Sequence, residues 1–259
     1  MRRVVFNQKG GVGKSTIACN LAAIAAHRGE TTLLIDLDPQ ANATRYLLGR
    51  TADDLGTTAS EFFDQMLNFT LRPKPTEEFI HPTPFANLFI LPADAALEEL
   101  QAKLEARYKI YKLREALERL GEYAQIWIDT PPALHFYTRS ALIAADACLI
   151  PFDCDEFARQ ALYSLLENVA EIRADHNQAL IVEGIVVNQY QARASLPTRL
   201  LDALRAEGLP VLQQTLSASV RIRESHSAAK PMIHFDPRHK LTQEFVVLYD
   251  ELESNARYR

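Results

Sequence analysis

A glycine-rich segment near the beginning of the chain carries the residue types best suited to chemistry. It reads Lys9-Gly10-Gly11-Val12-Gly13-Lys14-Ser15-Thr16 and follows a short apolar run at residues 3–6. The residues after it have apolar side chains at spacings of four and three, which predicts a helix. A turn between a strand and a helix points free backbone N–H groups at an anion, and glycines let the backbone approach that anion closely. The segment therefore predicts a site for the phosphates of a nucleotide.

Two side chains in this segment have defined roles at such a site. Lys14 is placed to reach the β- and γ-phosphates, and the Ser15 hydroxyl is placed to ligate Mg²⁺. The usual pattern has glycine where this chain has Gln8, and Lys9 adds a second lysine at the beginning of the loop. ATP and Mg²⁺ are the expected cofactors.

Three aspartates lie at the ends of apolar runs that predict buried strands. Asp36 and Asp38 come at the end of one run, and Asp129 ends another. Because ligands of open α/β sheets bind at the carboxyl ends of the strands, we expect all three carboxylates near the phosphate loop. Asp36 and Asp129 are candidate metal ligands, and a second carboxylate near the γ-phosphate can orient the attacking water. Helix capping or a structural role at the strand end is the alternative for each.

Strands that alternate with helices predict an α/β fold with a doubly wound, mostly parallel β-sheet flanked by helices. The expected strands are residues 3–6, 32–36, 88–91, 126–129, 147–150, 181–187 and 211–216. The expected helices follow the glycine-rich loop and the strand ending at 129, and cover residues 60–67, 94–120, 159–173, 197–207 and 242–252. No linker or repeat interrupts the pattern, so we expect one domain over residues 1–259.

Composition narrows the class of protein. The chain has 259 residues and a formal net charge of −5, which argues against a DNA-binding surface that covers the whole molecule. Its three cysteines lack Cys-x-x-Cys spacing, so neither a disulfide framework nor a thiolate zinc site is expected. The sequence has no signal peptide and no apolar stretch of membrane-spanning length, which predicts a cytoplasmic location.

The motifs together resemble the ParA/MinD family of deviant-Walker P-loop ATPases, and most closely the short, Soj-like ParA partition proteins. Four stretches, in the order found in the family, carry the resemblance over nearly the whole chain. They are residues 7–16, 34–44 (LIDLDPQANAT), 126–132 (IWIDTPP) and 219–231 (SVRIRESHSAAKP).

The resemblance implies that ATP brings two copies of the chain together face to face. Lys9 would then cross the interface to the partner's nucleotide, and Gly10 would lie where the subunits pack too closely for a side chain. Asp38 would position the hydrolytic water, Asp129 would support the metal, and Asn188 would lie near the adenine. The implied catalytic residues are Lys9, Lys14 and Asp38. The implied nucleotide-binding residues are Lys9, Gly10, Gly11, Val12, Gly13, Lys14, Ser15, Thr16 and Asn188.

The family also binds DNA without sequence preference once ATP has dimerised it. Residues 186–240 contain eight basic and four acidic side chains, so this segment carries +4 and the rest of the chain carries −9. Arg193 and Arg221 match family positions implicated in DNA binding, and Arg223 is a further candidate. Each of these arginines could instead be an ordinary surface residue or a member of a salt bridge.

The resemblance implies a cycle of dimerisation, association with the nucleoid and release when an adaptor like ParB stimulates ATP hydrolysis. Such a cycle segregates DNA or positions another large cargo. Two alternatives stay open: a membrane-cycling ATPase like MinD, and a nucleotide-locked adaptor with negligible hydrolysis. One departure from the family concerns the adenine side, where Ser217-Ala218-Ser219 replaces the frequent Pro-Arg-Asn.

Overall fold

The computed structural model describes residues 1–49, 55–68, 72–154, 158–191 and 195–257. A seven-stranded sheet forms its centre, with the order β3-β4-β2-β5-β1-β6-β7. Its strands are β1 (Arg2–Val5), β2 (Thr32–Asp36), β3 (His81–Pro82), β4 (Leu88–Leu91), β5 (Gln125–Asp129), β6 (Ala147–Asp153) and β7 (Ile181–Asn188). All neighbouring strands are parallel except for the short edge strand β3, which pairs antiparallel with β4. The expected mostly parallel sheet is confirmed.

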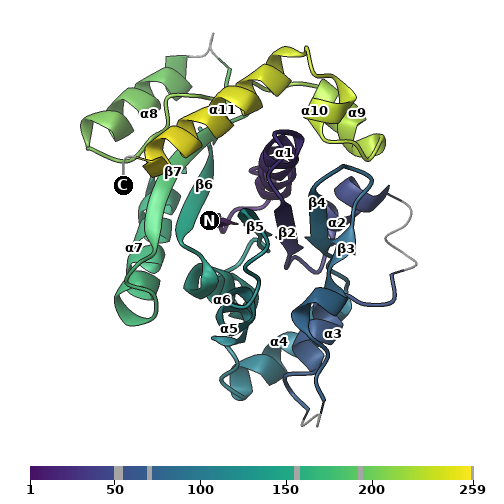
Figure 1. The fold of residues 1–259 in the computed structure, drawn as a ribbon. Coiled ribbons are helices and arrows are strands. Elements are labelled where there is room, and N and C mark those ends of the chain that lie inside the picture. Colours follow the sequence, from purple (N-terminus) through teal and green to yellow (C-terminus); the bar gives the residue numbers. More distant parts are fainter. Residues whose placement is uncertain (50–54, 69–71, 155–157, 192–194, 258–259) are drawn as a thin grey trace.

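Helices cover both faces of this sheet (Figure 1). The helices before β5 are α1 (Lys14–His27), α2 (Asn42–Leu48), α3 (Ala59–Asp64), the 3₁₀ helix η2 (Thr76–Phe79), α4 (Ala96–Ala106) and α5 (Lys112–Leu117). The later ones are α6 (Phe136–Ala144), α7 (Ala158–Asp175), α8 (Ser195–Ala206), α9 (Arg221–Ser227), α10 (Met232–Phe235) and α11 (Lys240–Arg257). In the part of the chain that the structure describes, no helix has the length and apolarity needed to cross a membrane.

The continuous apolar character of the central strands follows from burial on both faces. In β2, Leu33 and Ile35 join the core on the side of α3 to α7, whereas Leu34 joins the core on the side of α1 and α11. In β5, Ile128 and Trp127 divide between the two cores in the same way. Successive side chains of a strand point to opposite faces, so a strand covered on both sides has no solvent-exposed face that would favour a polar residue at every second position.

The expected single helix over residues 94–120 is wrong, because the chain breaks between α4 and α5. Leu104 and Leu113 are both fully buried in the same core. At about 100° per residue, a continuous helix would place these two side chains on opposite faces. The chain turns instead at Tyr108, whose φ of 54° lies in the left-handed region.

The expected strand at residues 211–216 is also wrong. This segment follows the edge of β7 but makes only isolated bridges to it, such as the one between Ile185 and Val211. The backbone N–H groups of Gln213 and Gln214 donate instead to the carboxylate of Glu251 on α11, at 2.7 and 2.9 Å. A side chain on a distant helix therefore takes the hydrogen bonds that a ladder would need.

Candidate functional site: a phosphate loop between two cavities

The glycine-rich loop connects β1 to α1 at the carboxyl edge of the sheet. Gly11 and Gly13 have φ values of 78° and 93°, a region that side chains disfavour. A Cβ on Gly13 would also lie 2.3 Å from Nδ2 of Asn188. That amide donates to the carbonyl of Val12 at 2.8 Å. The end of β7 thus supports the loop directly, and a side chain at position 13 would be strained by the backbone angle and would displace the Asn188 amide.

Lys14 begins α1, and its side chain is almost completely buried at 7% exposed. Its Nζ donates to the carbonyl of Lys9 at 3.2 Å, so the side chain bends back over the loop. Burial lowers the pKa of Lys14, and the carboxylates of Asp129 and Asp38 offset only part of that effect. Bound phosphate would supply the negative charge that this buried ammonium group needs.

The sheet register brings Asp36 and Asp129 side by side, as the final pair of β2 and β5. Both are fully buried, but their surroundings differ. Asp36 accepts hydrogen bonds from the amide and hydroxyl of Thr44, at 2.8 and 2.7 Å, and from the amide of Asp38 at 3.1 Å. Burial raises the pKa of Asp36 to about 6, against the opposing effect of these hydrogen bonds. Asp36 therefore holds the turn into α2 with both of its oxygens.

Asp129 is the carboxylate better prepared for a metal. Its Oδ1 accepts from the amide of Thr130 at 3.1 Å, whereas its buried Oδ2 has no hydrogen-bond partner among the described residues. Burial raises the pKa of Asp129 well above its ordinary value, Asp36 raises it further, and the Ser15 hydroxyl lowers it. An unpaired buried oxygen next to a hydroxyl fits Mg²⁺, which favours oxygen ligands and keeps several waters.

No cluster of three or more His, Cys, Asp or Glu side chains suited to a metal ion occurs among the described residues. A magnesium ion at Ser15 would therefore take its remaining ligands from nucleotide phosphates and water, as is usual for this ion. Asp38 lies 6% exposed in the wall of the same site, and its carboxylate accepts from the amide of Gln40 at 3.0 Å.

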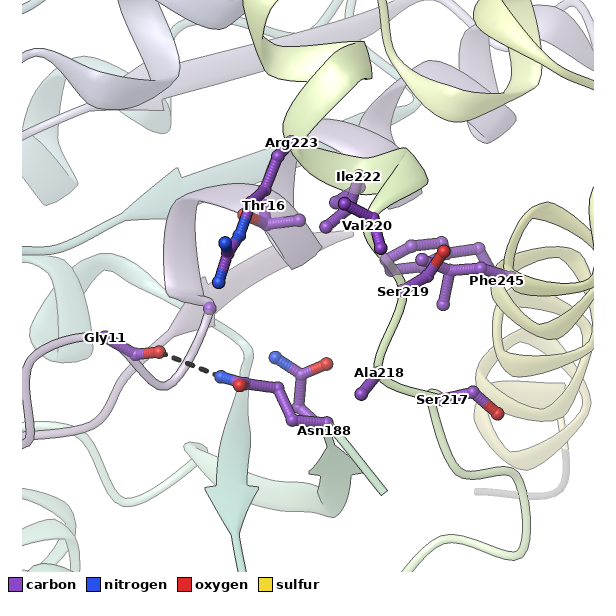
Figure 2. Close-up of a pocket in the computed structure, with 13 residues that line it drawn as sticks. Gly11, Thr16, Asn188, Ser217, Ala218, Ser219, Val220, Ile222, Arg223 and Phe245 are labelled. Atoms are coloured by element: carbon purple, nitrogen blue, oxygen red, sulfur yellow. Dashed lines mark hydrogen bonds between the residues drawn. The ribbon is translucent and has the colours of Figure 1, made fainter. Parts of the chain in front are cut away.

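Two cavities meet at the loop, and both are lined by Gly11, Gly13 and Thr16. The phosphate-side cavity, of about 490 Å³, is lined by Lys14, Ser15 and Asp38. The other, of about 660 Å³, lies on the Asn188 side and has an apolar wall that includes Ile222 and Phe245 (Figure 2). A polar phosphate site that opens into a partly apolar cavity has the form required by a nucleotide.

Several residues of these cavities were not predicted from the sequence. They belong to α2, to α9 and α11, and to the segments beside β7 and α9. They are Asn42, Arg45, Tyr46, Gln189, Val220, Ile222, His226, Leu241 and Phe245. No spacing links these residues to the loop, because the nucleotide-facing segments join only through the tertiary fold.

The two residues that precede the turn of the loop are accessible. Lys9 is exposed, and its Nζ lies 3.8 Å from a carboxylate oxygen of Asp153 at the end of β6. Gly10 is also exposed, and a Cβ built on it would meet no atom within 4 Å. The fold of one subunit thus leaves both positions open to the surface.

The three arginines predicted to bind DNA have different surroundings. Arg193 lies outside the described residues. Arg221 contacts the carboxylates of Glu224 and Asp236, at 2.5 and 3.0 Å. Arg223 instead lines the cavity on the Asn188 side. Arg221 and Arg223 lie on the same short helix, but the first pairs with carboxylates and the second lines a cavity.

A glycine-rich loop at the carboxyl edge of a parallel sheet, with a buried lysine and paired aspartates, defines a P-loop nucleotide-binding protein. A family model described as an AAA domain matches residues 3–182. The chromosome partitioning protein ParA of Caulobacter vibrioides is 34% identical over an alignment of 261 positions, which covers 98% of this chain and 94% of that protein. The sporulation initiation inhibitor protein Soj of Bacillus subtilis is 31% identical over 255 residues, with coverage of 97% and 98%. The chain belongs to the ParA/Soj family of P-loop ATPases.

A solved structure of similar fold contains the expected ligands. It is the cobyrinic acid a,c-diamide synthase from Mycobacterium smegmatis with bound ATP analogue and magnesium. The TM-score is 0.75 at 27% sequence identity, and the match covers 88% of this chain and 92% of the other. That protein shows that this fold accommodates a nucleotide with magnesium.

Proposed function

We propose that this protein is a ParA-type ATPase that partitions DNA or positions another large cargo. One observation carries the proposal: Lys9 and Gly10 are exposed beside the glycine-rich loop and its buried Lys14, in a chain 34% identical to a chromosome partitioning protein. A lysine on the surface next to the phosphate loop is placed to reach a nucleotide in a second subunit. The ATP-bound state is then a dimer with its two nucleotides at the interface.

The residues of the site support hydrolysis as well as binding. Lys14 and the loop N–H groups hold the phosphates, and bound Mg²⁺ neutralises the charge that develops on them. Asp38 lines the phosphate-side cavity, which supports a role for its carboxylate in orienting the attacking water. Asp129 lies beside the Ser15 hydroxyl, and the two residues hold the metal ion together. Hydrolysis removes the γ-phosphate and lets the dimer separate, and an adaptor protein similar in role to ParB accelerates that step.

We infer that the ATP dimer binds DNA without sequence preference and so associates with the nucleoid in the cytoplasm. Support comes from the charge of residues 186–240, which is positive in an otherwise acidic chain. Among the described residues of this segment, Lys230, Arg238 and Lys240 are exposed. Dimerisation doubles the number of phosphates that such a surface neutralises, and affinity rises steeply with that number.

The last helix argues for this role over a membrane cycle. α11 places Phe245, Leu248 and Tyr249 in the core against α1, where all three are buried. Its apolar face is therefore occupied by the fold itself. A helix that binds a membrane surface must offer its apolar face to lipid.

The test is binding to nonspecific duplex DNA with Mg²⁺ and ATP, ADP or no nucleotide, across a salt series. We expect salt-sensitive binding with ATP alone. Arg221→Ala should weaken it, and Arg28→Ala is the matched control. Arg28 also pairs with a carboxylate, that of Asp250, but it follows the far end of α1 from the loop. Absence of DNA binding in every nucleotide state would remove the partition role and leave a P-loop ATPase with another partner.

A further inference from the structure

The Arg223 side chain extends from α9 toward the phosphate loop (Figure 2). It lines the cavity of about 660 Å³ together with Gly11, Thr16 and Asn188. Arg223 is the only charged residue in the lining of that cavity, counted over the described part of the chain. A single guanidinium group thus faces the space between the phosphate loop and the apolar wall.

Arg223 and Arg221 differ in their ion pairs with the described residues. Within the described residues, no carboxylate forms an ion pair with Arg223. Arg221, two positions earlier on the same helix, pairs with Glu224 and Asp236 and lies over the ring of Phe235 at 4.8 Å. Of these two arginines, only Arg223 therefore has a guanidinium group that is not already paired with a described carboxylate and can bind a ligand.

The position of α9 is set by contacts to the nucleotide site. The imidazole Nε2 of His226 lies 3.1 Å from the hydroxyl of Thr16, and its ring packs on Tyr46 at 4.2 Å. The Tyr46 hydroxyl lies 2.5 Å from the hydroxyl of Ser225. Because Thr16 ends the glycine-rich segment, these contacts hold α9, which carries Arg223, next to the phosphate site.

The chemistry of the group identifies its ligand. A guanidinium group only donates hydrogen bonds and matches the geometry of phosphate oxygens. We propose that Arg223 binds a phosphate group of the bound nucleotide and is a nucleotide-positioning residue, not a DNA contact. This proposal rests on the nucleotide site of the proposed function but not on its DNA-binding step. Ala218 lines the same cavity at the position where the family frequently has arginine, and its methyl group cannot bind a phosphate.

The test is calorimetric titration with Mg²⁺·ADP in the absence of DNA, for the wild type, Arg223→Gln and Arg221→Gln. We expect Arg223→Gln to raise the Kd for ADP about tenfold, as for the loss of one charge-assisted hydrogen bond. Arg221→Gln should leave the Kd unchanged. Arg223→Lys should restore part of the affinity, because it returns the charge without the planar fork.

Two further readouts separate this proposal from its rivals. The thermal melting of nucleotide-free Arg223→Gln should match the wild type, since an exposed, unpaired side chain supports no fold contact. Wild-type affinity for ADP in Arg223→Gln, or an equal loss in Arg221→Gln, would overturn the proposal. If the wild type failed to bind DNA but Arg223→Gln still weakened ADP binding, the partition role would fail and the assignment of Arg223 would stand.

Discussion

Removal of Glu183 should strongly destabilise the fold, because its partner is a fully buried arginine. Arg3 lies at 0% exposure, and its guanidinium contacts Glu183 at 2.9 and 3.2 Å, Gln125 at 2.8 Å and Glu253 at 2.9 Å. It also packs on the ring of Trp127 at 5.1 Å. Burial alone would lower the pKa of Arg3, but the two glutamates raise it above its ordinary value.

The loss of unfolding free energy depends on which of the two glutamate partners of Arg3 is removed. Breaking a buried ion pair from one side costs about 3–5 kcal/mol, because the other charge remains buried. In Glu183→Ala, Glu253 still faces Arg3, so we expect about 3 kcal/mol. Glu253 is 23% exposed in its side chain, and Glu253→Ala leaves the buried pair intact. That variant should cost about 1 kcal/mol.

The assay is urea unfolding of the nucleotide-free protein, followed by fluorescence. Trp127 is the only tryptophan of the chain and contacts Arg3, so the signal reports this region directly. Glu118→Ala is the control, since Glu118 pairs with Arg114 on the surface and its loss should cost little. Equal losses in Glu183→Ala and Glu118→Ala would refute the reasoning.

Three other predictions concern the site and its surroundings. Gly10→Val should fold and bind ADP like the wild type, since its Cβ meets no atom within 4 Å, yet fail to dimerise with ATP in light scattering; a dimer with ATP would contradict the role of Gly10. Asp38→Ala should bind ATP within about twofold of the wild type but lower the phosphate-release rate at least about 10²-fold, and an unchanged rate would exclude Asp38 from the chemistry. Burial and the neighbouring His27 lower the pKa of His234 below its ordinary value of 6.5, so the folded state binds fewer protons than the unfolded state and loses stability as pH falls below that value. His234→Phe, which keeps the stack on Phe85, should therefore lose less unfolding free energy than the wild type between about pH 7.5 and pH 5.5; equal losses would contradict this assignment.

The parts of the fold that were predictable depend on local pattern. The apolar runs at residues 32–36 and 88–91 coincide with β2 and β4, because strands buried on both faces need apolar side chains at every position. The loop at residues 9–16 was equally clear, since a phosphate site on backbone N–H groups requires glycine. Both features are determined within a few residues of sequence.

The missed parts depend on contacts between distant segments. Residues 211–216 do not form a strand, because the backbone of Gln213 and Gln214 donates to Glu251 on α11. The apolar pattern of this segment does not indicate that partner. Likewise, His226 meets Thr16 across 210 residues of sequence. The apolar wall of the nucleotide cavity is assembled from such segments, so spacing alone could indicate the phosphate half of the site but not the other half.

The central claim is that the site is an ATP-driven dimerisation switch. Its most direct test is the molar mass of the protein in solution with Mg²⁺ and ATP, ADP or no nucleotide, with Asp38→Ala used to slow hydrolysis. The account predicts a dimer with ATP alone and a monomer in the other two states. A mass that stays the same in all three states would contradict it.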